Sequence, residues 1–426
     1  MSAPADLPDN PQLQHREFFV DIDTASGPVR NVGFPFAAPG LPRPVRLREA
    51  QVVDAAVGWA NDDTDPPAGR RPRSKRARGA ALDGVRVLDL TWVLAGPYVT
   101  KILGEHGTDI VKVESVHRHD PTRFAPSMRL RPGASSDESG YFVNFNRNKR
   151  SLSLNLRTAG GRRLLQRLVA TVDVVVENFS PGVLERWGLG YPALREINPD
   201  VVLVSMAGVG QTGPWQRAVT FADTLGAMSG LTHETGRADR PPQGLTFGLG
   251  DMVAANSATL AALDLLYRGH GGHVDLSQLE AMAAQVGPAL VEATADAGTA
   301  SGVFRTRGDD RWIAIGAALG EPPGGTDQDA ETLAARLQEQ GIPAYPVRDG
   351  RDLVEHDPQL AAGGFYVELT HPLIGRVAHE GVVARLHDTP GGLWDPAPLL
   401  GQHTDELLTE LLGLDPDEPR DEGALE

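Results

Sequence analysis

The 426-residue sequence contains no cysteine. This absence excludes disulfide bonds, thiolate zinc sites and a cysteine nucleophile, so any covalent chemistry must use a hydroxyl, an amine, an imidazole or a carboxylate. Three familiar motifs are missing as well: the HExxH zinc motif, the Walker A phosphate loop and the GxSxG nucleophile turn. The nearby histidines His117 and His119 are better explained as loop residues, and we assign no metal.

Long apolar runs and an excess of positive charge are also missing. No uninterrupted apolar stretch reaches the length needed to cross a bilayer, and the first residues, MSAPADLPDN, lack both parts of a secretory signal. With 40 Lys and Arg against 56 Asp and Glu, the formal net charge is −16, which argues against nonspecific binding to nucleic acid or anionic membranes. We therefore expect a cytoplasmic protein without a nucleic-acid or membrane partner.

Two features distinguish the N-terminal part of the chain. Residues 70–78 (RRPRSKRAR) form a dense basic run; a nucleic-acid patch is one interpretation, but no aromatic residue is interleaved, and we favour a flexible linker over 59–81. Upstream, PQLQHREFFVDI at 11–22 matches PQLAAGGFYVEL at 358–369 without a gap. Residues 1–58 therefore look like a second copy of an element near the C-terminus, without the rest of a domain.

From residue 82 the sequence alternates between strand-like and helix-like segments. Short runs rich in valine, isoleucine and leucine indicate buried strands, and apolar residues three to four positions apart indicate helices. This alternation predicts an α/β fold with a Rossmann-like parallel sheet. The expected strands are 84–91, 109–115, 172–178 and 200–206, and the expected helices are 98–107, 161–171, 181–188, 252–269 and 331–341.

The string GVGQTG at 208–213 satisfies the GxGxxG pattern and follows an expected strand. A dinucleotide site would also need a helix that opens at once, with its N-terminus under the pyrophosphate. Pro214 and Trp215 follow instead, and no clear strand ending in an acidic residue lies about 20 positions later. A tight glycine turn is therefore the better interpretation.

The string GLGD at 248–251 places a carboxylate after two glycines and before the long apolar helix. On local sequence alone, the first interpretation is that Asp251 is the N-cap of this helix and accepts a free backbone N–H. A catalytic role is compatible with that position, because the same N–H groups and the helix dipole would keep the carboxylate ionised. The glycines would leave room for a bulky electrophile.

Six segments and a C-terminal tail form an ordered signature. They are LDGVRVLDLTWVLAGPYVTKILGEHGTDIVKVE (82–114), NRNKRSLSLNLRT (146–158), ENFSPGVLERWGLGY (177–191), GVGQTGP (208–214), GLGD (248–251), GGHVDLSQLEA (271–281) and APLLGQHTDELLTELLG (397–413). In this order they resemble the class III coenzyme A transferases, the CaiB/BaiF family. The resemblance implies a Rossmann-like large domain and a small domain, with two chains interlocked as a homodimer. We accordingly expect the large domain at 82–281, a reduced small domain with its linker at 282–380, and a C-terminal segment at 381–426 that returns to the large domain.

The resemblance also implies the chemistry. Asp251 would be the catalytic nucleophile of a CoA transferase that moves CoA from an acyl-CoA to a carboxylic acid, through an aspartyl anhydride and an aspartyl-CoA thioester. A carboxylate suits this reaction because its anhydride conserves the activation of the thioester. For the apolar CoA contacts core packing is the alternative interpretation, and for the two arginines it is a surface ion pair. The implied CoA-binding residues are Val93, Leu94, Ala95, Leu154, Asn155, Leu156, Arg157, Asn178, Phe179, Ser180 and Arg186.

Departures from the family pattern leave two other functions open. Residues 221–223 hold neither the family's frequent tyrosine nor its racemase histidine, and the stretch 282–330 is shorter than the family's small domain. A 2-methylacyl-CoA racemase of the same fold would need a second acid or base facing Asp251, for which His233 is a candidate. A non-catalytic acyl-CoA-binding subunit is the other alternative, and the intact Asp251 argues against it.

Overall fold

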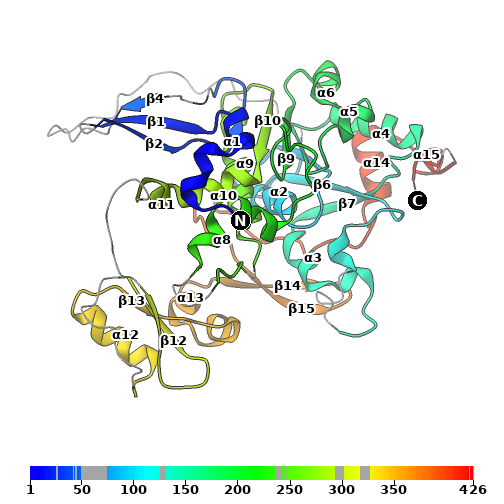
Figure 1. Ribbon diagram of the computed structural model, residues 1–426. Helices are drawn as coiled ribbons and strands as arrows, with labels where there is room; N and C mark the ends of the chain where they lie inside the picture. The colour runs from blue at the N-terminus through cyan, green and yellow to red at the C-terminus, as the bar shows by residue number, and fades with distance from the viewer. Residues whose placement is uncertain are drawn as a thin grey trace. The chain divides into compact units, whose positions relative to one another are not determined.

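The computed structural model divides into two compact units, Met1–Ala293 with Glu368–Glu426, and Thr294–Val367 (Figure 1). Most of the expected linker at 59–81 lies outside the described residues, and the second unit is shorter than the stretch 282–380 expected for the small domain together with its linker. The structure describes residues 1–24, 27–41, 43, 46–48, 74–124, 131–236, 241–245, 247–292, 302–316, 327–421 and 423–425.

A seven-stranded sheet forms the centre of the first unit, in the order β3-β10-β9-β8-β5-β6-β7. All neighbouring strands run parallel except β3, which pairs antiparallel with β10 at one edge. The central strands are rich in valine and fully buried, as parallel strands covered on both faces require. The strands are β3 (Phe36–Ala37), β5 (Arg86–Asp89), β6 (Asp109–Glu114), β7 (Lys149–Ser153), β8 (Val174–Glu177), β9 (Val202–Ala207) and β10 (Gly272–Ser277).

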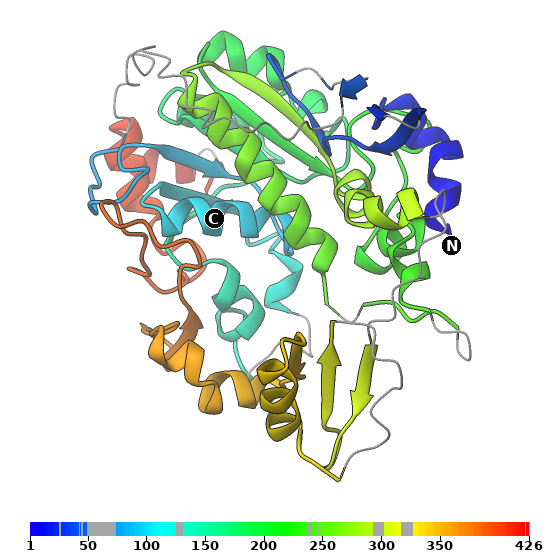
Figure 2. The same ribbon diagram turned by 90° about the vertical axis from the view of Figure 1, so that its left-hand side faces the viewer.

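Helices cover both faces of this sheet, which confirms the predicted α/β fold. One face packs against α4, α6 and α14, and the other packs against α2 and α9 (Figure 2). By length and composition, α9 is the one helix of the described chain that could cross a membrane, but its alanines are fully buried against the sheet and α2. The helices are α2 (Ala95–Glu105), α4 (Ala159–Val169), α6 (Tyr191–Ile197), α9 (Leu249–Tyr267) and α14 (Thr404–Leu412).

The strand order reverses beside β5. The chain runs from β5 through β6 to β7 on one side, and from β8 through β9 to β10 on the other. In open α/β sheets, such a switch point leaves a crevice at the carboxyl ends of the strands, where ligands bind. The loops that follow β5, β8 and β9 all leave the sheet at this edge.

The N-terminal segment packs onto the first unit and forms no separate body. Strands β1, β2 and β4 make a small sheet of their own, while β3 extends the main sheet. Leu7, Leu13 and Phe18 are buried in one cluster with Met282. The elements of this segment are η1 (Pro4–Asp9), α1 (Pro11–His15), β1 (Phe19–Thr24), β2 (Gly27–Val32) and β4 (Arg46–Arg48).

The second unit has a three-stranded antiparallel sheet, β11-β12-β13, packed against α12 through Ile313, Leu333 and Leu337. Its elements are β11 (Gly302–Arg305), β12 (Trp312–Ile315), α12 (Ala330–Glu339), β13 (Ala344–Pro346), η6 (Asp352–His356) and α13 (Pro358–Ala362). The remaining elements are η2 (Pro121–Arg123), η4 (Ser136–Glu138), α3 (Gly140–Phe145), α5 (Val183–Arg186), α7 (Ala222–Met228), α8 (Leu231–Glu234), α10 (Gln278–Ala283), η5 (Ala284–Val286), α11 (Gly287–Glu292), β14 (Tyr366–His371), β15 (Gly375–Glu380) and α15 (Asp417–Asp421).

Candidate active site

A cavity of about 1260 Å³ opens at the carboxyl edge of the sheet, within the first unit. Its walls come from the loops after β5, β8 and β9 and from the starts of α9 and α10. Asp251, Gln278 and Tyr141 all line it. The cavity is larger than the roughly 300–1,000 Å³ of a typical small-molecule site, so it has room for an extended ligand.

Asp251 is the third residue of α9, and the N-cap of this helix is Gly248. The interpretation of Asp251 as the N-cap is therefore wrong, because the helix begins two residues earlier. Its Oδ1 accepts a hydrogen bond from Nε2 of Gln278 at 2.8 Å. Burial raises the pKa of Asp251, and the bonds from Gln278 and from the backbone only partly oppose the rise. The helix start thus does not produce the expected net stabilisation of the ionised form, and the carboxylate is partly desolvated on the cavity wall.

The two glycines before Asp251 have different roles. A Cβ at position 248 would lie 2.7 Å from Cδ2 of Leu94 and 2.8 Å from Oδ2 of Asp251. A Cβ at position 250 would overlap the sulfur of Met282 instead. Gly248 therefore keeps space around the carboxylate, whereas Gly250 allows α9 to pack closely on α10.

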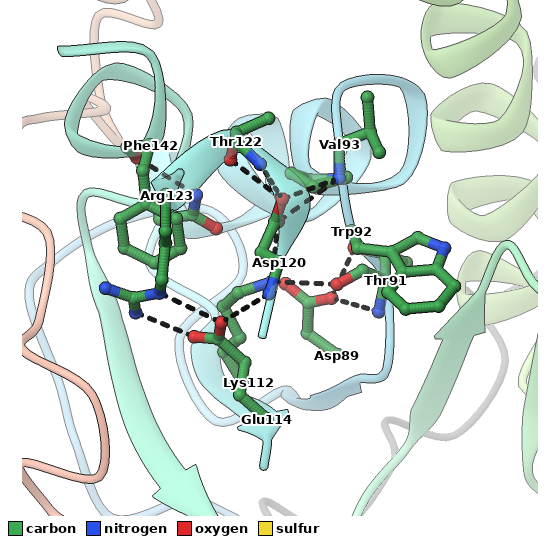
Figure 3. Close-up of polar contacts among 12 residues, drawn as sticks. Asp89, Thr91, Trp92, Val93, Lys112, Glu114, Asp120, Thr122, Arg123 and Phe142 are labelled. Atoms are coloured by element: carbon green, nitrogen blue, oxygen red, sulfur yellow. Dashed lines mark hydrogen bonds and ion pairs between the residues drawn. The ribbon is translucent and has the colours of Figure 1, made fainter. Parts of the chain in front are cut away.

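The loop between β5 and α2 forms a second wall, where Val93, Leu94 and Ala95 line the cavity. Val93 has a left-handed φ of 67°, which is strained for a β-branched residue. Its amide donates to both carboxylate oxygens of Asp120, at 3.2 and 3.1 Å (Figure 3). Asp120 also accepts from the amide and the hydroxyl of Thr122. This carboxylate therefore holds the strained loop in one conformation.

A buried ion pair supports the start of the same loop. Oδ2 of Asp89 lies 3.0 Å from Nζ of Lys149, and its Oδ1 accepts from the amide of Thr91 at 2.9 Å. Nζ of Lys112 donates to the carbonyl of Thr91 at 2.8 Å (Figure 3). Burial opposes the ionisation of Asp89, but the charges of Lys149 and Lys112 outweigh it and lower its pKa to about 2. Burial lowers the pKa of Lys149 to about 8.

The segment after β8 lines the same cavity with Asn178, Phe179 and Ser180, and Arg186 lies there at the end of α5. Asn178 joins this segment to the β5–α2 loop, because its Oδ1 accepts from the amide of Trp92 at 3.1 Å and its Nδ2 donates to the carbonyl of Trp92 at 2.8 Å. Arg186 is exposed and forms no ion pair with any described residue. Its guanidinium is thus available to a ligand.

The third group of expected CoA contacts is not on the cavity. Leu154 is buried in the core, and the amide of Asn155 donates to the carbonyl of Ala424. Leu156 packs against the same core, and Arg157 is exposed without an ion pair among the described residues. These four residues therefore lie outside this cavity, and their contact with CoA stays a prediction. The sheet order accounts for their position, because β7 lies at an outer edge with β6 between it and β5.

Sequence reasoning missed Gln278 and Tyr141. Gln278 directly follows β10, so its place at the end of a strand was the available signal. Burial raises the pKa of Tyr141 to about 12, and the negative charges of Asp251 and Asp120 add to the shift. At neutral pH Tyr141 is therefore a protonated hydroxyl donor near the carboxylate, and no sequence pattern indicates this.

The candidate second base, His233, lies on α8 and is not among the residues that line the cavity. His273 is the histidine on the described cavity wall; its Nε2 lies 2.9 Å from Oγ of Ser205, and burial lowers its pKa. Phe221 and Asp223 also line the cavity. The described residues include no group of three or more His, Asp or Glu side chains placed to hold a metal ion.

The fold and the site define a Rossmann-like enzyme with a partly desolvated carboxylate in a large cavity at the switch point of its sheet. The family model of CoA-transferase family III matches residues 82–321 and 326–404, and the chain belongs to this family. The predicted function, the transfer of CoA by a class III transferase, is thereby confirmed.

Two curated relatives and one solved structure show how far the similarity extends. The chain is 32% identical to succinyl-CoA–D-citramalate CoA-transferase of Chloroflexus aurantiacus, over 79% of this chain and 95% of that protein. It is 33% identical to succinyl-CoA:glutarate CoA-transferase of Mus musculus, over 84% of this chain and 91% of that protein. A CaiB/BaiF family protein from Brucella suis has a TM-score of 0.68 at 26% identity, and the match covers 78% of this chain and 100% of that one.

Proposed function

We propose that Asp251 is the nucleophile of this CoA transferase and that the reaction passes through an aspartyl anhydride and an aspartyl-CoA thioester. The supporting observation is the half-buried carboxylate on the wall of a cavity large enough for an acyl-CoA. No cysteine competes for the role, because the chain has none. A carboxylate also conserves the activation of the thioester, which a serine ester would not do.

The reaction has two halves, and each half consists of two nucleophilic substitutions at a carbonyl carbon. An oxygen of Asp251 attacks the thioester carbonyl, the C–S bond breaks, and CoA leaves as a thiolate, so that a mixed anhydride between Asp251 and the donor acyl group remains. The thiolate then attacks Cγ of Asp251 and expels the donor carboxylate, which leaves an aspartyl-CoA thioester. The acceptor carboxylate attacks this thioester and releases the thiolate again. Attack of the thiolate on the acceptor's carbonyl forms the new acyl-CoA and restores the Asp251 carboxylate.

Two neighbouring donors support these steps. Nε2 of Gln278 already donates to Oδ1 of Asp251, so it would stabilise the oxyanion that forms on this oxygen when the thiolate attacks. The hydroxyl of Tyr141, whose pKa is raised to about 12 chiefly by burial, keeps its proton at neutral pH. It is the candidate donor for the oxyanion on the acyl group.

CoA would lie along the cavity between the β5–α2 loop and the segment after β8. Its phosphates require cations or backbone N–H groups, and exposed Arg186 and Arg217 line the cavity. We propose Val93, Leu94, Ala95, Asn178, Phe179 and Ser180 as the remaining contacts. On the resemblance alone, we also propose Leu154, Asn155, Leu156 and Arg157, which do not line this cavity.

We propose a short dicarboxylic acyl-CoA, such as succinyl-CoA, as the donor. Relatives from Chloroflexus aurantiacus and Mus musculus carry names of succinyl-CoA-dependent transferases. Arg217 would pair with the free carboxylate of such a donor if the phosphates of CoA occupy Arg186. A cytoplasmic location, the absence of a membrane or nucleic-acid partner, and a homodimer rest on the sequence and the resemblance alone.

The test is to trap the enzyme-bound intermediate. Incubation with succinyl-CoA followed by borohydride or hydroxylamine is expected to modify Asp251, as read by peptide mass spectrometry. Asp251→Asn is expected to abolish the adduct and to lower kcat by about 10³-fold or more, while the melting temperature stays close to the wild-type value.

The matched control is Asp223→Asn, because this carboxylate lines the same cavity and has no role in the proposed steps. It is expected to keep the adduct at Asp251. Exchange of the α-proton of a 2-methylacyl-CoA for deuterium without an adduct would identify a racemase instead. Tight acyl-CoA binding with neither adduct nor exchange would identify a binding subunit.

A further inference from the structure

The sequence repeat is also a structural repeat. We call residues 10–20 the N-terminal copy and residues 357–367 the C-terminal copy. In both, the first residue caps the helix by accepting from two following amides, and the amide that opens the next segment donates back to the carbonyl of the shared leucine. Glu17 and Gly364 occupy equivalent places with left-handed φ angles of 51° and 56°. Each copy leads into a strand that pairs in a hairpin.

The N-terminal copy is recognised specifically by the first unit. Gln12 is fully buried, and its Nε2 donates to the carbonyls of Val209 and Thr212, at 2.7 Å each. Its Oε1 accepts from the amide of Trp215 at 2.9 Å. One carboxamide thus satisfies three backbone groups of the GVGQTGP turn and its next residue. Leu13 lies beside it, also fully buried.

An ion-pair cluster adds to this contact. Arg16 pairs with Asp275 at 2.7 Å and with Glu280, whose side chain is fully buried. A Cβ at Gly210, whose φ is 89°, would overlap the guanidinium of Arg16. We call residues 208–215 together with Asp275 and Glu280 the receiving surface. All of them lie in the part of the chain that matches the family, whereas the N-terminal copy precedes that part.

The C-terminal copy carries the same side chains without such a surface. Gln359 is exposed, and its carboxamide has no hydrogen-bond partner among the described residues. Leu360 and Phe365 are only half-buried, whereas their N-terminal equivalents are buried. Gly363 stands where the other copy has Arg16, so this copy lacks a cation for an acidic receiving surface.

We propose that the C-terminal copy is a docking element for the large domain of a second, non-identical class III transferase. The large domain of the partner has a surface like the receiving surface of this chain. That surface is not filled by an N-terminal copy, and it lacks the acidic residues that correspond to Asp275 and Glu280. Two identical chains cannot make this contact, since the N-terminal copy fills the surface in each and the C-terminal copy has no arginine for Asp275 and Glu280. The proposal concerns the assembly of the protein. Its tests measure mass in solution and not activity, so their outcome does not depend on the role of Asp251.

The first experiment uses the full chain alone. The double variant Gln359→Ala/Leu360→Asp is expected to have the same mass as the wild type by sedimentation equilibrium, whatever that mass is. The control is Leu373→Asp, at an exposed leucine that lies between β14 and β15 and outside the copy. A wild-type dimer that the double variant dissociates, but the control does not, would overturn the proposal.

In the second experiment, a variant of this chain with an unfilled receiving surface takes the place of the partner. Leu13→Asp/Arg16→Ala is designed to release the N-terminal copy from its surface, and Gly363→Arg gives the C-terminal copy of another chain the missing cation. A mixture of the two folded variants is expected to form a complex heavier than either variant alone, with an affinity at least tenfold above that of the same mixture made with unchanged Gly363. Adding Leu360→Asp should abolish the complex. If both variants melt cooperatively and still fail to associate, the proposal is wrong; if the released variant does not fold, the first experiment decides.

Discussion

Gln278 influences the chemistry of Asp251 through one hydrogen bond. Burial raises the pKa of this carboxyl group, and the bond from Nε2 of Gln278 lowers it. Gln278→Ala is therefore expected to raise the pKa of Asp251 further, so that the acid limb of kcat/KM moves to higher pH. At pH 7 the rate should fall on the order of tenfold and recover in part at higher pH. Full pH–rate profiles of both proteins measure the shift.

Gln285 provides the matched control for this prediction. It lies after the same helix and donates to the carbonyl of Ala281 at 3.4 Å, and it does not line the cavity. Gln285→Ala should leave the acid limb in place. An equal loss of rate at every pH in Gln278→Ala would argue for a purely structural role of that residue.

From the sequence, the residues of the site could be predicted only where they belong to one short motif. The family signature predicts Asp251 as the nucleophile, whereas its expected place at the N-cap was wrong, because GLGD alone does not show that Gly248 is the cap. Gln278 and Tyr141 come from segments far from Asp251 in the sequence, and only the folded sheet edge brings them together. Such partners are invisible to local patterns.

At the level of elements, the four expected strands correspond to β5, β6, β8 and β9, but β7 was not predicted. Its residues KRSLS include two cations, yet all five are buried. Lys149 pairs with Asp89, and Arg150 pairs with Asp109 at 2.8 Å. Since burial of a cation depends on an anion from another strand, the periodicity of the strand itself gives no signal.

The helix α1 is expected to stabilise the cavity wall through Gln12. Gln12→Ala removes the partners of three backbone groups in residues 209–215, at about 1–3 kcal/mol for each buried group left unpaired. The free energy of unfolding should fall by roughly 3 kcal/mol, and KM for acyl-CoA should rise because Val209 and Thr212 line the cavity. Urea unfolding and steady-state kinetics measure the two effects.

Gln14 lies on the same helix, and its exposed side chain donates to the carbonyl of Pro8, so Gln14→Ala is the control for that prediction. Both its stability and its KM should stay near the wild-type values. A Gln12→Ala protein as stable as Gln14→Ala would show that the N-terminal copy is not held by this carboxamide.

At the level of the whole molecule, the bounds of the two compact units differ from the domain bounds expected from the sequence. The second unit covers Thr294–Val367, whereas 282–380 was expected for the small domain together with its linker. Helix α11 packs against β2 and η1 of the N-terminal segment, which places it in the first unit. At the other end, Glu380 of β15 pairs with Lys101 at 2.7 Å. Both boundaries depend on contacts distant in sequence, so composition could not locate them.

The pH dependence of stability should reveal one buried carboxyl group, Glu177 at the end of β8. Burial raises its pKa from the ordinary 4.5 to about 7, although it accepts from the amide of Phe179 at 2.7 Å. The folded chain therefore binds this proton more tightly than the unfolded chain. The resulting stability is fully present below pH 4.5 and is lost as the pH rises through about 7.

Glu177→Gln removes this titration and keeps an oxygen that can accept from Phe179. The variant should be more stable than the wild type at pH 8, on the order of 3 kcal/mol, and the difference should shrink toward zero near pH 4.5. Urea unfolding at both pH values measures it. Glu196→Gln, at an exposed site on α6, should show no such dependence. Since a packing effect of glutamine would be equal at both pH values, only a difference that grows with pH supports a buried, protonated Glu177.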